Sequence, residues 1–324
     1  MKHISGNVYR IPRRFNWPFV VGGFALLALV LMLWRWGGTV GDALAYFDTA
    51  RWLRGELPLA ALRAPFSWRL GVPALAAIVP GDLHHVFGAL NWLFVTATAC
   101  LATATVRRMG FGTERALIAG LLVAVSLPTA WYAPYLFVEP GSICMRTLFV
   151  FAVLTAQPRL ALVAALAATA VSEENILLLG WLLATRQVGR AQGLAALGAA
   201  LAWLAAVRWW IEADVPASAW PDAAFVANRL SDGWGWLSLA ACAGPVALLA
   251  VAGLRHAPPR IGQLKSLLAL MAVPAVYAAL CVRIDGRLAW GLYPFLVPLA
   301  AAAGMPRRAE TRPDVLQLRT ARRA

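Results

Sequence analysis

Two carboxylates stand beside apolar stretches of this 324-residue chain, where charged side chains are costly and usually serve a purpose. Asp42 follows the first apolar stretch, and Glu139 precedes a later one. A carboxylate in such a position can act as a general base or bind a cation. Plainer interpretations also exist. Asp42 could be the N-cap of a short helix over 43–54 that ends at Gly55, and Glu139 could form a structural ion pair with Arg146.

Three arginines are candidates for binding a phosphate, because a planar guanidinium donates two parallel hydrogen bonds. Arg69 lies in a proline-flanked turn, Arg146 lies inside the apolar run 141–156, and Arg287 follows Asp285 in a turn before the last run. Contact with lipid headgroups is the alternative for Arg69. An ordinary surface turn is the alternative for the pair Asp285 and Arg287.

The remaining candidates to line a cavity are Tyr46, Asp48, Glu173 and Glu174, together with Asp285. Glu173 and Glu174 are adjacent, so on a helix they point about 100° apart and cannot both face one partner. Either one of them faces a cavity, or the pair only interrupts the helix. Asp48 is also three residues from Arg51, which predicts an exposed ion pair of little energetic weight.

Composition places these residues in a membrane protein. The chain is 61% hydrophobic and 14% charged, whereas soluble domains carry about a quarter charged residues. This excludes an ordinary soluble enzyme. The net charge of +14 comes from arginines scattered between apolar runs, without the basic stripe of a nucleic-acid-binding fold. Phosphate-loop and dinucleotide motifs are absent, so we expect neither nucleic acid nor nucleotide to bind.

The apolar runs predict an all-α, polytopic bundle of about ten membrane helices. Two of them are too short to span fully and meet at the polar break 172–175. We expect one membrane domain over 1–304, with interfacial helices in an outer loop over 37–80, and a basic cytoplasmic tail over 305–324. The predicted runs are 17–36, 84–105, 116–136, 141–156, 159–171, 176–184, 192–211, 236–254, 266–282 and 288–304.

The loop charges predict the orientation. Basic residues concentrate in 1–16, 106–115, 185–191, 255–265 and 305–324, which the positive-inside rule places in the cytoplasm. Of the 15 acidic residues, only Glu114, Glu310 and Asp314 fall on that side. We therefore expect both termini in the cytoplasm, a multi-pass membrane protein, and a carboxylate-lined pocket at the outer face.

This order of features resembles the GT-C class of membrane glycosyltransferases. The resemblance rests on Asp42 after the first span with Tyr46, Ala50 and Gly55 behind it, and on Glu139 in the outer turn between the third and fourth spans. The turn 65–69, the broken helices around Glu173 and the ending from Asp285 to Pro294 also resemble small bacterial proteins of this type. No single motif is diagnostic.

The resemblance implies transfer of a sugar from a polyprenyl-phosphate donor to an acceptor at the outer face of the inner membrane, in polysaccharide assembly. Asp42 would deprotonate the acceptor, and Glu139 would orient it or share a divalent cation, Mg²⁺ or Mn²⁺, with Asp42. Arg69, with Arg287 or Arg146, would stabilise the departing lipid phosphate. The partners would be membrane lipids and the lipid-linked donor.

Two other functions fit the same sequence. A transporter or flippase for a lipid-linked saccharide would place its substrate at the broken helices, but the second half of the chain holds no matching interrupted segment. A non-catalytic membrane subunit of a polysaccharide system would leave Asp42, Glu139 and Arg69 apart in space.

Overall fold

The computed structural model describes residues 15–211 and 223–303, and helices make up nearly all regular structure within these ranges. The isolated parallel bridge between Gly38 and Tyr135 is the only β-type pairing there. The predicted tail 305–324 and most of the predicted cytoplasmic segment 1–16 lie outside the described residues. In chain order the helices are α1 (Trp17–Leu33), α2 (Asp42–Leu53), α3 (Gly71–Ile78), α4 (Leu83–Arg108), α5 (Thr113–Ala124), α6 (Leu127–Tyr132), α7 (Glu139–Leu154), α8 (Pro158–Val171), α9 (Ile176–Ala184), α10 (Arg190–Trp210), α11 (Ala223–Leu230), α12 (Gly233–Leu254), α13 (Pro259–Gly262), α14 (Leu264–Cys281), α15 (Gly286–Trp290) and α16 (Tyr293–Ala301).

Five helical stretches of the described chain are long and apolar enough to cross a membrane. The chain is therefore an all-α protein with the features of a multi-pass membrane protein, as the composition predicted. Two further apolar helices, α1 and α8, are shorter. The five stretches are Leu83–Arg108, Thr113–Tyr132, Arg190–Trp210, Gly233–Leu254 and Pro259–Cys281.

Two predicted continuous runs are interrupted. The run 116–136 divides into α5 and α6, because the Ser126 hydroxyl accepts from the backbone N–H of Thr129 at 3.3 Å and caps a new helix. The run 288–304 divides at Gly291 into α15 and α16. Hydropathy does not register these breaks, since the residues on both sides of each break are apolar.

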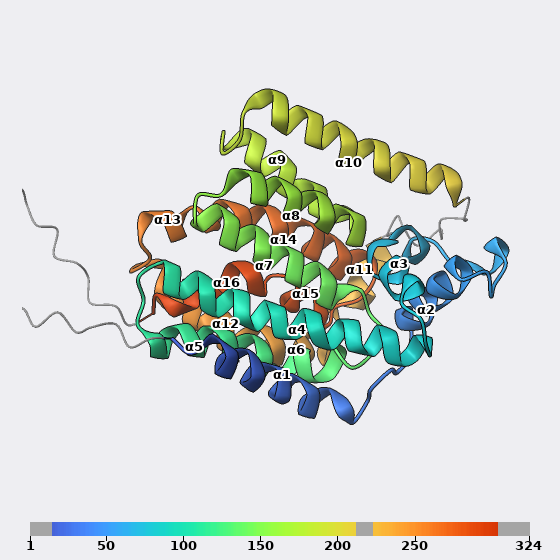
Figure 1. Ribbon diagram of the computed structural model, residues 1–324, viewed down its shortest axis with the longest axis horizontal. Coiled ribbons are helices and arrows are strands. Elements are labelled where there is room, and N and C mark those ends of the chain that lie inside the picture. The colour runs from blue at the N-terminus through green and yellow to red at the C-terminus, as the bar shows by residue number, and fades with distance from the viewer. Residues whose placement is uncertain (1–14, 212–222, 304–324) are drawn as a thin grey trace, which may run out of the picture.

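The helices pack side by side and alternate in direction (Figure 1). The connections from α4 to α5, α7 to α8, α9 to α10 and α12 to α13 gather at one end of the bundle, whereas α2 and α3 lie at the other. The aromatic ring of Phe15, just before α1, lies 4.0 Å from the guanidinium carbon of Arg107 at the end of α4. Helix α1 therefore starts at the end where these connections gather and runs toward the end where α2 and α3 lie. We call this second end the acidic end.

Two short helices cover the acidic end. Helix α2 confirms the helix predicted over 43–54, and Gly55 follows it with a φ of +76°, a conformation that favours glycine. Arg54, which the sequence did not single out, donates hydrogen bonds to four carbonyls at the end of α3, those of Ala76, Ala77, Val79 and Gly81. A cation at a helix C-terminus is stabilised by the helix dipole, so Arg54 fixes α2 against α3.

Buried threonine hydroxyls inside the bundle form hydrogen bonds within their own helices. Thr98, Thr103 and Thr147 each donate to the carbonyl four residues earlier, at 2.6–2.9 Å. In an apolar interior an unpaired hydroxyl is costly, and this bond removes the cost within the same helix. These polar side chains therefore fill space between helices and mark no binding site.

Candidate functional site

The guanidinium of Arg287 gathers three carboxylates at the acidic end. Its Nη1 lies 2.9 Å from Oδ2 of Asp42 and 3.8 Å from Oε1 of Glu139. Its Nε lies 3.1 Å from Oδ2 of Asp285. We call these four residues the Arg287 cluster. The side chains of Asp42 and Glu139 keep 31% and 23% of their surface exposed.

Short backbone contacts bring the two distant carboxylates together. The bridge between Gly38 and Tyr135 joins the segment four residues before Asp42 to the segment four residues before Glu139. The buried side chain of Asn91 on α4 donates to the carbonyl of Tyr135 at 2.8 Å, and to that of Phe137. The loops that lead into α2 and α7, the helices that begin with Asp42 and Glu139, are thus held to each other and to a long helix.

Asp285 has two roles in this cluster. Its Oδ1 accepts from the backbone N–H of Arg287 at 2.8 Å, which caps α15, while Oδ2 accepts from the guanidinium. The cap sets the direction of α15, and the side-chain bond sets the rotamer of Arg287. This arrangement aims the guanidinium at the other two carboxylates.

A second group of charges surrounds the break between α8 and α9, formed by the 3₁₀ turn Glu173–Asn175. Arg69 binds Glu173 with two parallel bonds of 3.0 and 3.2 Å, and its Nη1 donates to the Tyr46 hydroxyl at 2.8 Å. Tyr46 is fully buried. We call Arg69, Arg146, Glu173 and Glu174 the break cluster.

Arg146 on α7 is the buried centre of the break cluster. Its Nη2 donates to Glu174 at 2.7 Å, its Nε to Oδ1 of Asn175 at 2.5 Å, and its Nη1 to the carbonyl of Gly291 at 2.9 Å. That carbonyl belongs to the interruption between α15 and α16, where a helix end leaves acceptors without intrahelical partners. Arg146 therefore joins the break in α8–α9 to the break in α15–α16.

The two clusters are electrostatically connected. Burial of Tyr46 raises the pKa of its hydroxyl, and the charges acting on that hydroxyl include Arg69, Glu139 and Asp42. Burial would lower the pKa of Arg287, but Glu139, Asp285 and Asp42 raise it well above its ordinary value, so Arg287 stays charged. The site combines five carboxylates with three guanidiniums, an excess of two negative charges when all are ionised.

Burial raises the pKa of Glu139, which stands before the apolar run 141–156, although Arg287 and Arg69 act in the opposite direction. Oε2 of Glu139 is buried and has no hydrogen-bond partner among the described residues. Its hydrogen-bonding capacity is therefore unused within the described residues.

Several plain interpretations of the sequence are wrong. Gly41 occupies the N-cap position of α2, and Asp42 makes no capping bond but accepts from Arg287. Arg146 pairs with Glu174 rather than with Glu139. Glu173 and Glu174 do more than interrupt a helix, because each binds a different arginine, as their divergent directions require.

The other candidate residues divide into two groups. Asp285 belongs to the Arg287 cluster, Glu173 and Glu174 belong to the break cluster, and Tyr46 accepts a hydrogen bond from Arg69. Asp48 lies outside both clusters and pairs with Arg51 at 3.7 Å. Asp42 and Glu139 meet at Arg287, whereas Arg69 lies in the break cluster with Glu173. Each of the three arginines predicted to bind phosphate has a carboxylate partner.

Asn175 and Gly291 are site residues that sequence reasoning missed. Asn175 is fully buried, and its Nδ2 donates to Ser142 at 3.0 Å and to the carbonyl of Ala168 at 2.9 Å. Its place in the polar break was a usable signal, since a buried amide must find partners. Gly291 acts through its backbone carbonyl, for which side-chain chemistry gives no signal.

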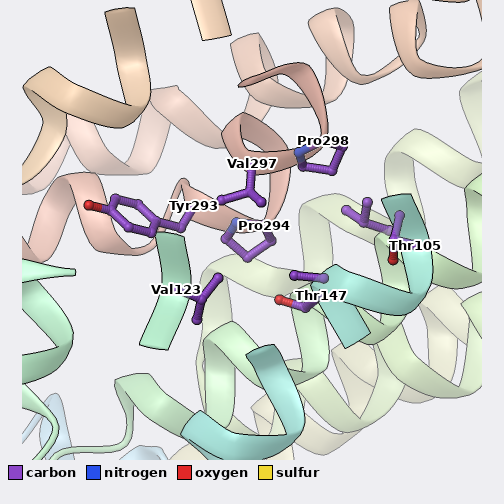
Figure 2. A pocket seen from close by; sticks show the side chains of 9 residues that line it. Thr105, Val123, Thr147, Tyr293, Pro294, Val297 and Pro298 are labelled. Atoms are coloured by element: carbon purple, nitrogen blue, oxygen red, sulfur yellow. The ribbon is translucent and has the colours of Figure 1, made fainter. Parts of the chain in front are cut away.

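Two cavities lie away from the charged residues. One, about the size of a single water at ≈ 10 Å³, is enclosed by α4, α5, α7 and α16, and Figure 2 shows Thr105 and Thr147 near Pro294 and Val297 around it. The other, of ≈ 250 Å³, is lined by residues of α7, α8 and α9 and of the loops after α7 and α9. Neither includes a member of the two clusters.

The three carboxylates of the Arg287 cluster surround a guanidinium. Within the described residues, no three His, Cys, Asp or Glu side chains are grouped so that they could hold a metal ion. Arg287 supplies the positive charge between Asp42 and Glu139 in this arrangement. The shared divalent cation stays a prediction.

No family model matches the chain, and no curated protein matches it either.

Proposed function

We propose that the Arg287 cluster is the reaction centre of a membrane glycosyltransferase of the GT-C type, which uses a polyprenyl-phosphate-linked sugar. The observation that carries the proposal is the convergence of Asp42 and Glu139, from the starts of two separate helices, on one guanidinium at one end of an apolar bundle. A partly exposed carboxylate held in this way can accept a proton from an acceptor hydroxyl.

The proposed step transfers the sugar from the lipid phosphate to an acceptor hydroxyl. Asp42 takes the proton of an acceptor hydroxyl while the oxygen of that hydroxyl attacks the anomeric carbon of the sugar. The bond from the anomeric carbon to the phosphate oxygen breaks, and its electron pair stays on the phosphate. The products are a glycoside, a protonated Asp42 and a free polyprenyl phosphate.

The arginines would stabilise the departing phosphate. Two nitrogens of Arg287 bind carboxylates, whereas its Nη2 has no hydrogen-bond partner among the described residues. That amino group can donate to a phosphate oxygen, and charge-assisted bonds of this kind are strong. Arg69 would contribute its positive charge from the acidic end of the bundle. Arg146 would hold the break between α8 and α9 beside the break between α15 and α16.

Glu139 would limit the negative charge of the site. A site with two excess negative charges repels a phosphate, so protonation of one carboxylate favours donor binding. Burial already favours the protonated form of Glu139. In that form Glu139 can donate a hydrogen bond to the acceptor or the sugar.

We also propose how many times the chain crosses the membrane and on which side its termini lie. The helices α1, α4, α5–α6, α7, α8, α9, α10, α12, α14 and α16 would be ten passes, with the short α8 and α9 meeting inside the protein. Both termini would be cytoplasmic, and the acidic end would face the outside of a bacterial inner membrane. The concentration of arginines in the loops at the opposite end supports this orientation.

The test is release of polyprenyl phosphate by purified full-length protein. The protein in detergent is given a panel of polyprenyl-phosphate monosaccharides with a bacterial membrane lipid extract as acceptor. We expect Asp42→Asn to reduce release about 100-fold or more, in the range of general-base catalysis. Asp48→Asn, the same change on the same helix outside the clusters, should leave it unchanged. Equal turnover of Asp42→Asn and the natural protein would remove Asp42 from the mechanism.

A metal arm of the same assay separates the two possible sources of positive charge. If Asp42 and Glu139 share a divalent cation, EDTA abolishes release and added Mg²⁺ or Mn²⁺ restores it. If Arg287 supplies the charge alone, release survives EDTA and is lost in Arg287→Gln. A flippase would instead move the intact lipid-linked sugar across a vesicle membrane without releasing polyprenyl phosphate.

A further inference from the structure

Arg35, two residues beyond α1, lies in a notch of aromatic rings. Its guanidinium carbon is 3.8 Å from the ring centre of Trp34 and 4.0 Å from that of Trp131, at the end of α6. Its Nη1 donates to the Tyr135 hydroxyl at 2.8 Å. The two tryptophan rings are inclined at 65°, so Arg35 fills the angle between them. We call these four residues the Arg35 notch.

Arg35 has no carboxylate partner among the described residues. None of their carboxylate oxygens lies within 4.0 Å of its guanidinium nitrogens, in contrast to Arg69, Arg146 and Arg287. The rings stabilise the cation by cation–π attraction without cancelling its charge. Its position is also fixed, so little further side-chain entropy is lost when an anion binds.

Two exposed apolar surfaces lead to the notch. Along α1, the exposed Leu26, Val30 and Leu33 are followed by Trp34, which is 57% exposed. Along α5 and α6, a second row of exposed apolar side chains ends at Trp131, which is 44% exposed. Helices α1 and α6 contact each other. The second row consists of Ile118, Leu121, Val125 and Leu127.

This combination matches the outline of a lipid. Acyl or prenyl chains fit the apolar surfaces, and tryptophans mark the depth where the hydrocarbon layer meets the headgroups. A fixed guanidinium at that depth suits a phosphate, because its free N–H groups lie in one plane and can donate in parallel. Neither the apolar rows nor the cation alone would specify such a ligand.

We propose that the Arg35 notch binds the phosphate ester of an anionic membrane lipid whose chains lie along α1 and α5–α6. The site is separate from the Arg287 cluster, and the proposal goes beyond the proposed sugar transfer without depending on it. Two lipids carry the required chemistry, a phospholipid with an anionic headgroup and a polyprenyl phosphate.

The experiment measures lipid binding to delipidated full-length protein in a neutral detergent by native mass spectrometry. Titration with phosphatidylglycerol is compared with phosphatidylcholine of the same chains, and farnesyl phosphate is compared with farnesol. Inorganic phosphate is the third probe. We expect a preference for at least one of the two lipid phosphates over its neutral partner, weakened about tenfold in Arg35→Gln. The pair that shows the effect identifies the source of the phosphate.

The matched control is Arg63→Gln, which removes an exposed charge from the loop between α2 and α3. It should leave both titrations unchanged. Equal weakening in Arg35→Gln and Arg63→Gln would reduce the effect to overall charge and overturn the proposal. So would natural affinity in a folded Arg35→Gln, or inorganic phosphate that binds as tightly as the lipids do.

A second variant covers the case in which Arg35→Gln fails to fold. Tyr135→Phe keeps the charge and the aromatic rings but removes the hydroxyl that holds Nη1. We expect it to weaken lipid binding roughly threefold, the effect of one hydrogen bond. Binding that is the same for Tyr135→Phe and the natural protein, together with no preference of the natural protein for lipid phosphates, would also overturn the proposal.

Discussion

Nη1 of Arg287 lies 2.9 Å from Oδ2 of Asp42, although 245 positions of sequence separate the two residues. The contact ties the start of α2 to α15, the short helix that precedes α16. Glu139, at the start of α7, adds a third part of the chain. A single guanidinium thus holds the starts of three helices together, so its loss should lower the stability of the fold as well as any activity.

Replacement of Arg287 should therefore cost more stability than replacement of Asp42. Arg287→Gln leaves three neighbouring carboxylates without their cation, and we expect the free energy of unfolding to fall by about 2–3 kcal/mol. Asp42→Asn leaves Arg287 with Asp285 and Glu139, so we expect a loss of about 1 kcal/mol or less. Denaturant unfolding in a fixed detergent, followed by circular dichroism, measures both.

The double variant tests whether the contact itself carries this difference. Asp42→Asn with Arg287→Gln should be less destabilised than the sum of the single variants by about 1 kcal/mol, because the neutral amide that replaces the Asp42 carboxylate no longer adds to the uncompensated charge. Strict additivity would mean that Asp42 and Arg287 act independently, and the cluster would then be a coincidence of packing.

The gross fold was predictable because long apolar runs have few stable forms in a membrane. Helices α4, α10, α12 and α14 closely match the predicted runs, and the break between α8 and α9 lies where polar residues interrupt the apolar pattern. The interruptions at Ser126 and Gly291 were not predictable from hydropathy. They depend on a single cap and on a contact with Arg146 across the bundle.

The sequence predicted which charged residues lie in the two clusters better than it predicted which carboxylate pairs with which arginine. Asp42, Glu139, Arg69 and Arg287 attracted attention because ionisable residues near the membrane are costly. The sequence neighbour of Arg146 was Glu139, yet its partner is Glu174, brought near by the packing of α7 against α8. Which of two carboxylates pairs with an arginine is decided by the packing of the helices, and closeness in sequence predicts the partner poorly.

Asn175 should be the amide on which the break cluster depends most. Asn175→Ala removes one bond from Arg146, one to Ser142 and one to the carbonyl of Ala168, all of them buried. We expect a loss of about 2–3 kcal/mol in the free energy of unfolding. The control is Gln187→Ala, whose exposed amide makes one 3.3 Å bond to Gln263 at the other end of the bundle. Equal unfolding midpoints for the two variants would contradict this role for Asn175.

Glu139 should make the stability of the protein depend on pH. Burial raises its pKa above the ordinary value of 4.5, so the folded state favours the protonated form. The stability from this preference is full below that value and is lost as the pH rises through the pKa of the folded state. Glu139→Gln mimics the protonated form. It should match the natural protein near pH 4 and become the more stable of the two as the pH increases.

Parallel unfolding curves of Glu139→Gln and the natural protein from pH 4 to 8 measure this difference in stability. A constant offset between the two would show that Glu139 does not titrate differently in the folded state.

Gly253 on α12 marks a close approach of two helices, and a pair of substitutions can show it. A Cβ at this position would overlap the carbonyl of Leu299 on α16, and backbone cannot move aside as a side chain can. We expect Gly253→Ala to lower the free energy of unfolding by about 2–3 kcal/mol, as overpacking does. Gly198, inside α10, has no atom of another part of the protein within 4 Å of the added carbon. Because alanine favours a helix over glycine by about 1 kcal/mol, Gly198→Ala should be neutral or stabilising. Thermal unfolding of both variants in one detergent separates the two effects, and a Gly253→Ala protein as stable as Gly198→Ala would mean that α12 and α16 do not pack this closely in the folded protein.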